Sequence, residues 1–180
     1  EYDGAFDEDP PYIGDKGYLP HPTPRAAYAA MITRMDRDVG RIVDLLEELG
    51  LRENTLIAFS SDNGPTFNGG TDSTFFESAA HLRGLKGSVY EGGLRVPLVI
   101  NWPGNVAGGS STSHISAFQD VMPTLLGLAG VPTPTSVEGH SMVTGERRQR
   151  FYGEVGEGRR ATRMIHDGRH KLIPVGNRVQ

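Results

Sequence analysis

The sequence predicts an α/β fold built in layers, with a mainly parallel sheet. Three observations lead to this class: a long amphipathic helical pattern, two short apolar runs of strand length after it, and a second helical pattern after the strands. A helix and a sheet each carry an apolar face that must be covered, so elements in this order are expected to pack as layers. The length of 180 residues is enough for one domain with a core of its own.

The first element is a helix that follows an irregular segment rich in Asp, Gly, Pro and Tyr at residues 1–22. Apolar residues in the helix recur at spacings of three and four, which places them on one face. They are Tyr28, Ile32, Met35, Val39, Ile42, Leu46 and Leu49. Thr23 suits the N-cap, and Pro24 suits the first helical position because the N–H that proline lacks would have no partner there. Gly50 suits the left-handed position after the last turn.

Two apolar runs, residues 55–60 and 96–102, have the length and composition of strands. We expect the first of them to be buried on both faces. A second helix follows, with Asp120 as its N-cap and Gly130 at its end. Pro123 is tolerated there because it lies in the first turn.

Residues 63–94 form a long stretch with no helical or strand pattern. When ordered, such long loops usually carry a site, and ligands of open α/β sheets bind beyond the carboxyl ends of strands, where this stretch begins. At its start, Asp62 and Asn63 place a carboxylate and a carboxamide oxygen side by side. Such oxygens suit a hard divalent cation such as calcium. An ordinary Asp-Asn-Gly turn is the alternative.

A second candidate group is Lys86, which lies between Gly84 and Gly87 in the same stretch. A lysine flanked by glycines can approach an anion closely, and its compact charge suits sulfate or phosphate oxygens. From this segment alone, an ordinary solvated lysine is the alternative. The two glycines between Glu91 and Arg95 argue against a helix and favour a sharply bent loop before the second strand.

Several motifs, in order over residues 24–145, together resemble the sulfatase family of the alkaline-phosphatase superfamily. The motifs are YAAM at 28–31, MDRDVGR at 35–41, NTL at 54–56, SSDNGP at 60–65, LRGLK at 82–86, YEGGLRVP at 90–97 and DVMPTLL at 120–126. The resemblance implies an alkaline-phosphatase-like α/β/α sandwich, with residues 1–145 as the C-terminal part of the catalytic domain. Residues 146–180 would begin a small α+β C-terminal subdomain. Within it, residues 163–173 resemble a recurring hairpin, with Asp167 and Gly168 as a two-residue turn.

The resemblance also implies roles for individual residues. Asp62 and Asn63 match the late pair of ligands to a divalent cation, usually calcium, and Lys86 matches the lysine that contacts the sulfate group. A cation and a lysine can hold the non-bridging oxygens of the ester and stabilise charge on the leaving oxygen. His81 lies in the same loop, and we expect it near the substrate entrance. The family's nucleophile is a formylglycine made within a Cys/Ser-x-Pro-x-Arg motif, which is absent from this sequence.

The expected function is therefore part of a sulfuric ester hydrolase, whose complete form cleaves sulfate esters of small molecules or carbohydrates. The rest of the catalytic domain would be the partner of this chain, and the chain alone is expected to be inactive. Phe75 and Phe76 are available to contact a substrate ring, unless they pack locally. Two alternatives stay open: a phosphodiester or phosphonate hydrolase of the same superfamily, and a non-catalytic chain that binds metal or anions.

Composition and charge exclude other classes of protein. The formal net charge of −4 and the isoelectric point near 5.9 provide no basic surface for a nucleic acid. No apolar run approaches the length that spans a bilayer, and the absence of cysteine excludes disulfides and thiolate metal sites. The family resemblance implies a periplasmic or extracellular location. We expect Glu1 and Gln180 to be the ends of a segment rather than of the complete protein.

Overall fold

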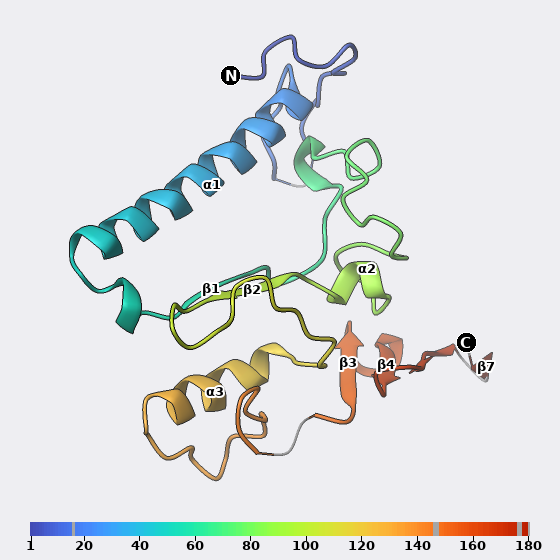
Figure 1. The fold of residues 1–180 in the computed structure, drawn as a ribbon. Coiled ribbons are helices and arrows are strands. Elements are labelled where there is room, and N and C mark those ends of the chain that lie inside the picture. Colours follow the sequence, from blue (N-terminus) through green and yellow to red (C-terminus); the bar gives the residue numbers. More distant parts are fainter. Residues whose placement is uncertain (16, 146–147, 176–177, 180) are drawn as a thin grey trace. The chain divides into compact units, whose positions relative to one another are not determined.

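The computed structural model describes residues 1–15, 17–145, 148–175 and 178–179. They form two compact units, Glu1–Ser110 and Ser111–Gln180. The first contains α1 (Pro24–Glu48), η1 (Arg52–Asn54), β1 (Ile57–Ser60), η2 (Asn68–Gly70), α2 (Glu91–Leu94) and β2 (Leu98–Asn101). The second contains η3 (Phe118–Asp120), α3 (Val121–Leu128), β3 (Phe151–Val155), η4 (Gly158–Arg160), β4 (Thr162–His166), β5 (Lys171–Leu172), β6 (Pro174–Val175) and β7 (Arg178–Val179) (Figure 1).

Helix α1 begins and ends where the sequence predicts. Gly50 has φ 66°, its N–H donates to the Glu47 carbonyl at 2.9 Å, and the Leu51 N–H donates to the Leu46 carbonyl at 2.9 Å. These two bonds form the glycine-terminated motif that satisfies the last carbonyls of a helix. The C-terminal end is therefore confirmed in detail.

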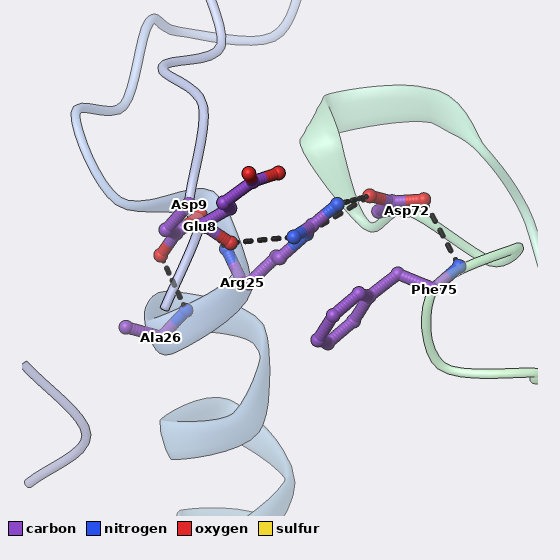
Figure 2. A network of polar contacts seen from close by, with 6 residues as sticks. All are labelled: Glu8, Asp9, Arg25, Ala26, Asp72 and Phe75. Atoms are coloured by element: carbon purple, nitrogen blue, oxygen red, sulfur yellow. Dashed lines mark hydrogen bonds and ion pairs between the residues drawn. The ribbon is translucent and has the colours of Figure 1, made fainter. Parts of the chain in front are cut away.

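The N-terminal end of α1 is capped by a different residue from the predicted one. Thr23 occupies the N-cap position, but its side chain makes no capping hydrogen bond to the described helix. The carboxylate of Asp9 takes this role instead, accepting the N–H groups of Arg25 at 2.8 Å and Ala26 at 3.0 Å (Figure 2). Negative charge is favourable at this end of a helix, so a distant carboxylate can replace the local hydroxyl.

The apolar face of α1 is mostly uncovered in this chain. Ile32, Met35, Ile42 and Leu49 are all exposed, and the buried residues of the helix are Pro24 and Ala26 in its first turn. The periodicity therefore predicted the helix and its apolar stripe correctly. Among the described residues of the stripe, Tyr28, Val39 and Leu46 are half-buried and none is fully buried.

Strands β1 and β2 form an antiparallel ladder, from Ile57 opposite Asn101 to Ser60 opposite Leu98. The prediction of a mainly parallel sheet does not hold for this pair. A parallel neighbour needs a crossover, usually a helix, whereas residues 61–97 contain only the short elements η2 and α2. The expected burial of the first strand on both faces is also wrong for the described structure, because Ala58 and Phe59 are exposed.

In the second unit, α3 follows η3 directly, and Gly130 ends it as predicted, with the Val131 N–H donating to the Leu126 carbonyl at 2.9 Å. Asp120 stands at the predicted N-cap position, but its side chain does not cap α3. Its carboxylate instead accepts hydrogen bonds from the backbone N–H of Ala117 and of His140. Asp120 thus caps the start of η3 and joins it to the segment of His140, and it does not cap α3.

The predicted hairpin at residues 163–173 is present as β4 and β5, the last two strands of the antiparallel sheet β3–β4–β5. Its turn lies one residue later than predicted. The Asp167 N–H donates to the His170 carbonyl at 3.1 Å, which makes Gly168 and Arg169 the central pair, and Gly168 has φ 92°. The carboxylate of Asp167 accepts the N–H groups of Arg169 and His170, an arrangement typical of Asp in turns.

The predicted subdomain boundary at 145/146 stays a prediction, since residues 146 and 147 lie outside the described residues. Across the helices that the structure describes, none combines the length and the apolar character needed to cross a membrane.

Candidate functional site

Three segments with predicted site residues or motifs meet after the end of β1. They are residues 61–65, residues 83–88 and helix α2. The Gly64 N–H donates to the Gly93 carbonyl at 3.0 Å, the Gly92 N–H to the Arg83 carbonyl at 2.8 Å, and the Lys86 N–H to the Pro65 carbonyl at 2.8 Å. The chain therefore connects the segment of Asp62 and Asn63 directly to the segment of Lys86 through backbone hydrogen bonds.

Glycines allow this close approach. A Cβ on Gly64 would lie 1.8 Å from the Gly92 carbonyl oxygen, one on Gly92 would lie 2.0 Å from the Gly84 oxygen, and one on Gly93 would lie 2.4 Å from the Ser88 oxygen. These atoms belong to the backbone, so no side-chain rotation could relieve the contacts. The glycine after Asp62 and Asn63 is thus required for backbone packing, and a simple turn does not account for it.

The predicted loop at residues 91–95 is instead the short helix α2, with the Arg95 N–H donating to the Glu91 carbonyl at 2.7 Å. The low helical propensity of glycine predicts a loop at this position. Gly92 and Gly93 are buried, however, and close packing against neighbouring carbonyls outweighs that propensity. The Gly-Gly pair therefore marks a close backbone contact.

Asp62 and Asn63 lie in the bend directly after β1. Asp62 is exposed, and its carboxylate makes no hydrogen bond or ion pair with the residues that the structure describes. Asn63 is half-buried, and its Nδ2 donates to the Gly64 carbonyl at 3.0 Å. This bond uses the amide nitrogen and leaves Asn63 Oδ1, the metal-binding type of oxygen, directed to no described donor. The Asp62 carboxylate and Asn63 Oδ1 therefore have no described partner that would compete with a cation.

The pair fits part of a calcium site. Calcium takes six to eight oxygen ligands, and Asp62 and Asn63 supply the right kind of oxygen. Within the described ranges, no group of three or more His, Cys, Asp or Glu residues could hold a metal ion. The remaining ligands of such a site would have to come from outside these residues or from water.

Lys86 is exposed, and its side chain forms no ion pair with the described carboxylates. The glycines on either side, Gly84 with φ 87° and Gly87 with φ 84°, adopt the left-handed backbone that favours glycine. A Cβ on Gly84 would also meet Ser88 Oγ at 2.4 Å, whereas Gly87 faces open space. The flanking glycines therefore shape the backbone that presents Lys86, in addition to leaving room around it.

A depression of about 440 Å³ lies beside Asn63. Its lining residues come from α1, from the loop that follows β1, and from α2 and the chain that leaves it. They are Tyr28, Ser61, Asn63, Gly64, Pro65, Thr66, Thr71, Ser78, Ala79, Ala80, Leu82, Gly92, Arg95, Val96 and Pro97. His81 is exposed and stands between the lining residues Ala80 and Leu82 without being one of them. Its expected place near a substrate entrance stays a prediction.

Phe75 and Phe76 pack locally. Their rings are 4.9 Å apart, both lie edge-on to Phe6 at 5.5 and 5.8 Å, and Phe76 is 5.1 Å from Tyr28. This cluster joins the N-terminal segment, the first turns of α1 and the loop. The aromatic pair is therefore structural in this fold, although Phe75 is 43% exposed.

The elements described above are those of an α/β protein, and comparison with known proteins identifies its family. A family model described as Sulfatase matches residues 2–131. This chain belongs to the sulfatase family. Mouse steryl-sulfatase is 37% identical over 110 residues, which are 60% of this chain and 18% of that protein. Human arylsulfatase A is 37% identical over 114 residues, which are 61% of this chain and 21% of that protein.

Solved structures agree with this assignment. A protein solved in complex with k-i-k-neocarrahexaose has a TM-score of 0.75 and 30% identity, over 87% of this chain and 36% of that chain. A second, solved with its substrate D-glucosamine-2-N,6-O-disulfate, has a TM-score of 0.67 and 28% identity, over 84% of this chain and 31% of that chain. These similarities confirm an alkaline-phosphatase-like α/β fold, of which this chain is a part. The chain spans about a fifth of the two curated relatives.

Proposed function

We propose that this chain supplies part of the metal and sulfate site of a sulfatase, and that the complete protein hydrolyses sulfate esters of carbohydrates. The observation that carries the proposal is the backbone connection between two motifs distant in sequence. The Lys86 N–H bonds to the Pro65 carbonyl, directly after Asp62 and Asn63. The carbohydrate class is supported by the two similar proteins that were solved with a neocarrahexaose and with a glucosamine disulfate.

The proposed roles follow from the charges and the oxygens of these residues. Asp62 and Asn63 would hold a calcium ion, which supplies positive charge for the oxygens of the sulfate group when it is bound. The Lys86 ammonium would add a second positive charge toward the same oxygens, where charge on the transferred group and the leaving oxygen must be stabilised. A formylglycine nucleophile would come from a segment that is not part of this sequence.

The proposal is tested in the complete sulfatase with calcium and a chromogenic aryl sulfate. Asp62→Ala should abolish turnover and weaken calcium binding in calorimetry, because one of the cation's charged ligands is removed. Lys86→Ala should lower kcat about 100-fold or more while calcium binding is kept. Asp38→Ala, which removes only exposed ion pairs with Arg37 and Arg41 on α1, serves as the control. Unchanged turnover in Asp62→Ala would refute the assignment of the metal pair.

The same assay distinguishes a sulfatase from a phosphodiester hydrolase, which is the alternative within the superfamily. A phosphodiester with the same aryl leaving group is compared with the sulfate ester in the unmodified protein. Faster cleavage of the phosphodiester would favour a phosphodiester hydrolase over a sulfatase.

We also propose a periplasmic or extracellular location, by analogy with the family. Fractionation of the producing cells tests this location.

A further inference from the structure

Arg25, in the first turn of α1, joins three segments of the chain. Its Nε and Nη2 donate to Asp72 Oδ2 at 3.0 and 2.7 Å, and its Nη1 donates to the Glu8 carbonyl at 2.5 Å (Figure 2). Its guanidinium carbon lies 3.8 Å from the centre of the Phe75 ring. All three guanidinium nitrogens thus have partners, and the side chain is only 15% exposed.

Asp72, the partner of Arg25, has an unusual backbone. Its φ is 43°, and Glu77 and Ala80 in the same loop have φ of 47° and 48°. Residues other than glycine keep such conformations only where their surroundings impose them. Asp72 Oδ1 also accepts the Phe75 N–H at 3.2 Å, so its carboxylate bonds to Arg25 through one oxygen and to its own loop through the other. The hydrogen bonds from Arg25 hold the pKa of Asp72 below its usual range.

The loop held in this way forms one side of the depression beside Asn63. We call residues 71–82 the wall segment. Thr71, Ser78, Ala79, Ala80 and Leu82 of this segment line the depression. The packing of Phe75 and Phe76 on Phe6 and Tyr28 is a second attachment of the wall segment to the N-terminal segment and α1.

We propose that Arg25 is a positioning residue, which clamps the strained wall segment to the start of α1 and so sets the shape that the carbohydrate part of the substrate meets beside Asn63. The contribution to substrate fit rests on the proposed function, whereas the clamping does not. The fork of the guanidinium is essential, because it reaches Asp72 and the Glu8 carbonyl together while the face of the group lies over Phe75. A lysine ammonium has the charge but cannot reproduce this geometry.

Amide hydrogen exchange of the 180-residue chain tests the clamp. The reporter amides are Phe76 and Ser78 in the wall segment, which donate to the Asp72 and Ser73 carbonyls, and Leu49 at the far end of α1. In Arg25→Met, exchange of the two wall amides should be at least about tenfold faster, while Leu49 is unchanged. Asp72→Asn, which tolerates the same φ, should give the same pattern. The double variant should be no faster than Arg25→Met, because the pair is already broken.

The matched control is Arg41→Met, which removes an exposed ion pair with Asp38 from the same helix. It should leave the wall amides unchanged. Unchanged wall exchange in Arg25→Met, or equal acceleration at Leu49, would overturn the clamp. The second outcome would mean that Arg25 supports the whole fold and not this segment.

Kinetics of the complete sulfatase test the effect on the substrate. Arg25→Lys should raise KM for a sulfated oligosaccharide about tenfold with kcat nearly kept, which is the signature of lost binding shared by ground and transition states. KM for a small aryl sulfate, which extends less over the wall segment, should change little. Equal effects on both substrates would overturn the role in substrate fit. If the unmodified protein cleaves no sulfate ester, the proposed function fails, while the exchange experiment still decides the clamp.

Discussion

At the scale of single residues, Asp120 and Arg148 form a buried ion pair in the second unit. The Asp120 side chain is 1% exposed and that of Arg148 is 9% exposed. Nε and Nη2 of Arg148 donate to the two carboxylate oxygens at 2.8 and 2.5 Å. Burial alone would raise the pKa of Asp120, but the hydrogen bonds from Arg148, His140 and Ala117 outweigh it, so the pKa is lowered.

This lowered pKa predicts acid sensitivity. A carboxyl group whose folded pKa lies below its unfolded value of about 3.9 contributes full stability above that value and loses it as pH falls through the folded pKa. At pH 7, Asp120→Asn should destabilise the chain by about 3–5 kcal/mol, because the buried Arg148 loses its counter-charge. The difference in the free energy of unfolding between the unmodified chain and Asp120→Asn should become smaller toward pH 3. Urea unfolding at several pH values measures this difference, with Asp38→Asn as an exposed control. A difference that does not change with pH would contradict the lowered pKa of Asp120.

At the scale of elements, backbone packing between α2, residues 83–88 and the chain after β1 holds the segments of the candidate site together. Three glycines, Gly64, Gly92 and Gly93, make this packing possible. A Cβ at each of these positions would overlap a different backbone carbonyl oxygen. The proposed metal ligand Asp62 and the proposed sulfate-contacting Lys86 contribute little to this packing, since both are exposed. The scaffold and the chemistry of the site are therefore carried by different residues, and substitutions can separate them.

Alanine scanning of glycines tests this separation. Gly64→Ala should destabilise the first unit by about 1–3 kcal/mol or prevent its folding, because the new Cβ would overlap the Gly92 carbonyl. Gly40→Ala, in the middle of α1 with nothing within 4 Å of its Cβ position, should instead stabilise by about 0.5–1 kcal/mol. Thermal unfolding of both variants provides the comparison. Equal effects at the two positions would show that the close approach at Gly64 is not important.

The same elements show which features the sequence can predict. Helix α1 and its glycine end follow from local periodicity and propensity, and both are confirmed. The direction of β2 beside β1, the capping by Asp9 and the helix at Gly92 and Gly93 depend on segments that are far apart in the chain, so local patterns could not supply them. The candidate site residues Asp62, Asn63 and Lys86 were predicted from the order of the motifs, and the structure adds the backbone hydrogen bonds that join their segments.

At the scale of the whole molecule, the described chain leaves apolar surface on α1 and on Phe59 of β1 exposed. It also contains only part of the length of its relatives and two oxygen ligands of the proposed metal site. These facts together support the proposal that the remainder of a sulfatase domain covers this surface and completes the site.

The chain alone should therefore have no sulfatase activity. Purified 180-residue protein, incubated with an aryl sulfate and added calcium, is expected to release no product above the buffer blank. The complete sulfatase, assayed in parallel at the same molar concentration, provides the positive control. Measurable turnover by the pure chain would show that it contains a nucleophile and would exclude the proposed division of the site.

The contact between Gly64 and Gly92 also limits how this family member can evolve. A Cβ at position 64 would overlap a peptide carbonyl, and the neighbouring residue is already the smallest amino acid. No reduction of another side chain can make room for it. In a genetic selection that starts from Gly64→Ala, second-site suppressors should therefore be scarce, and recovered activity should come mostly from reversion at the codon for residue 64.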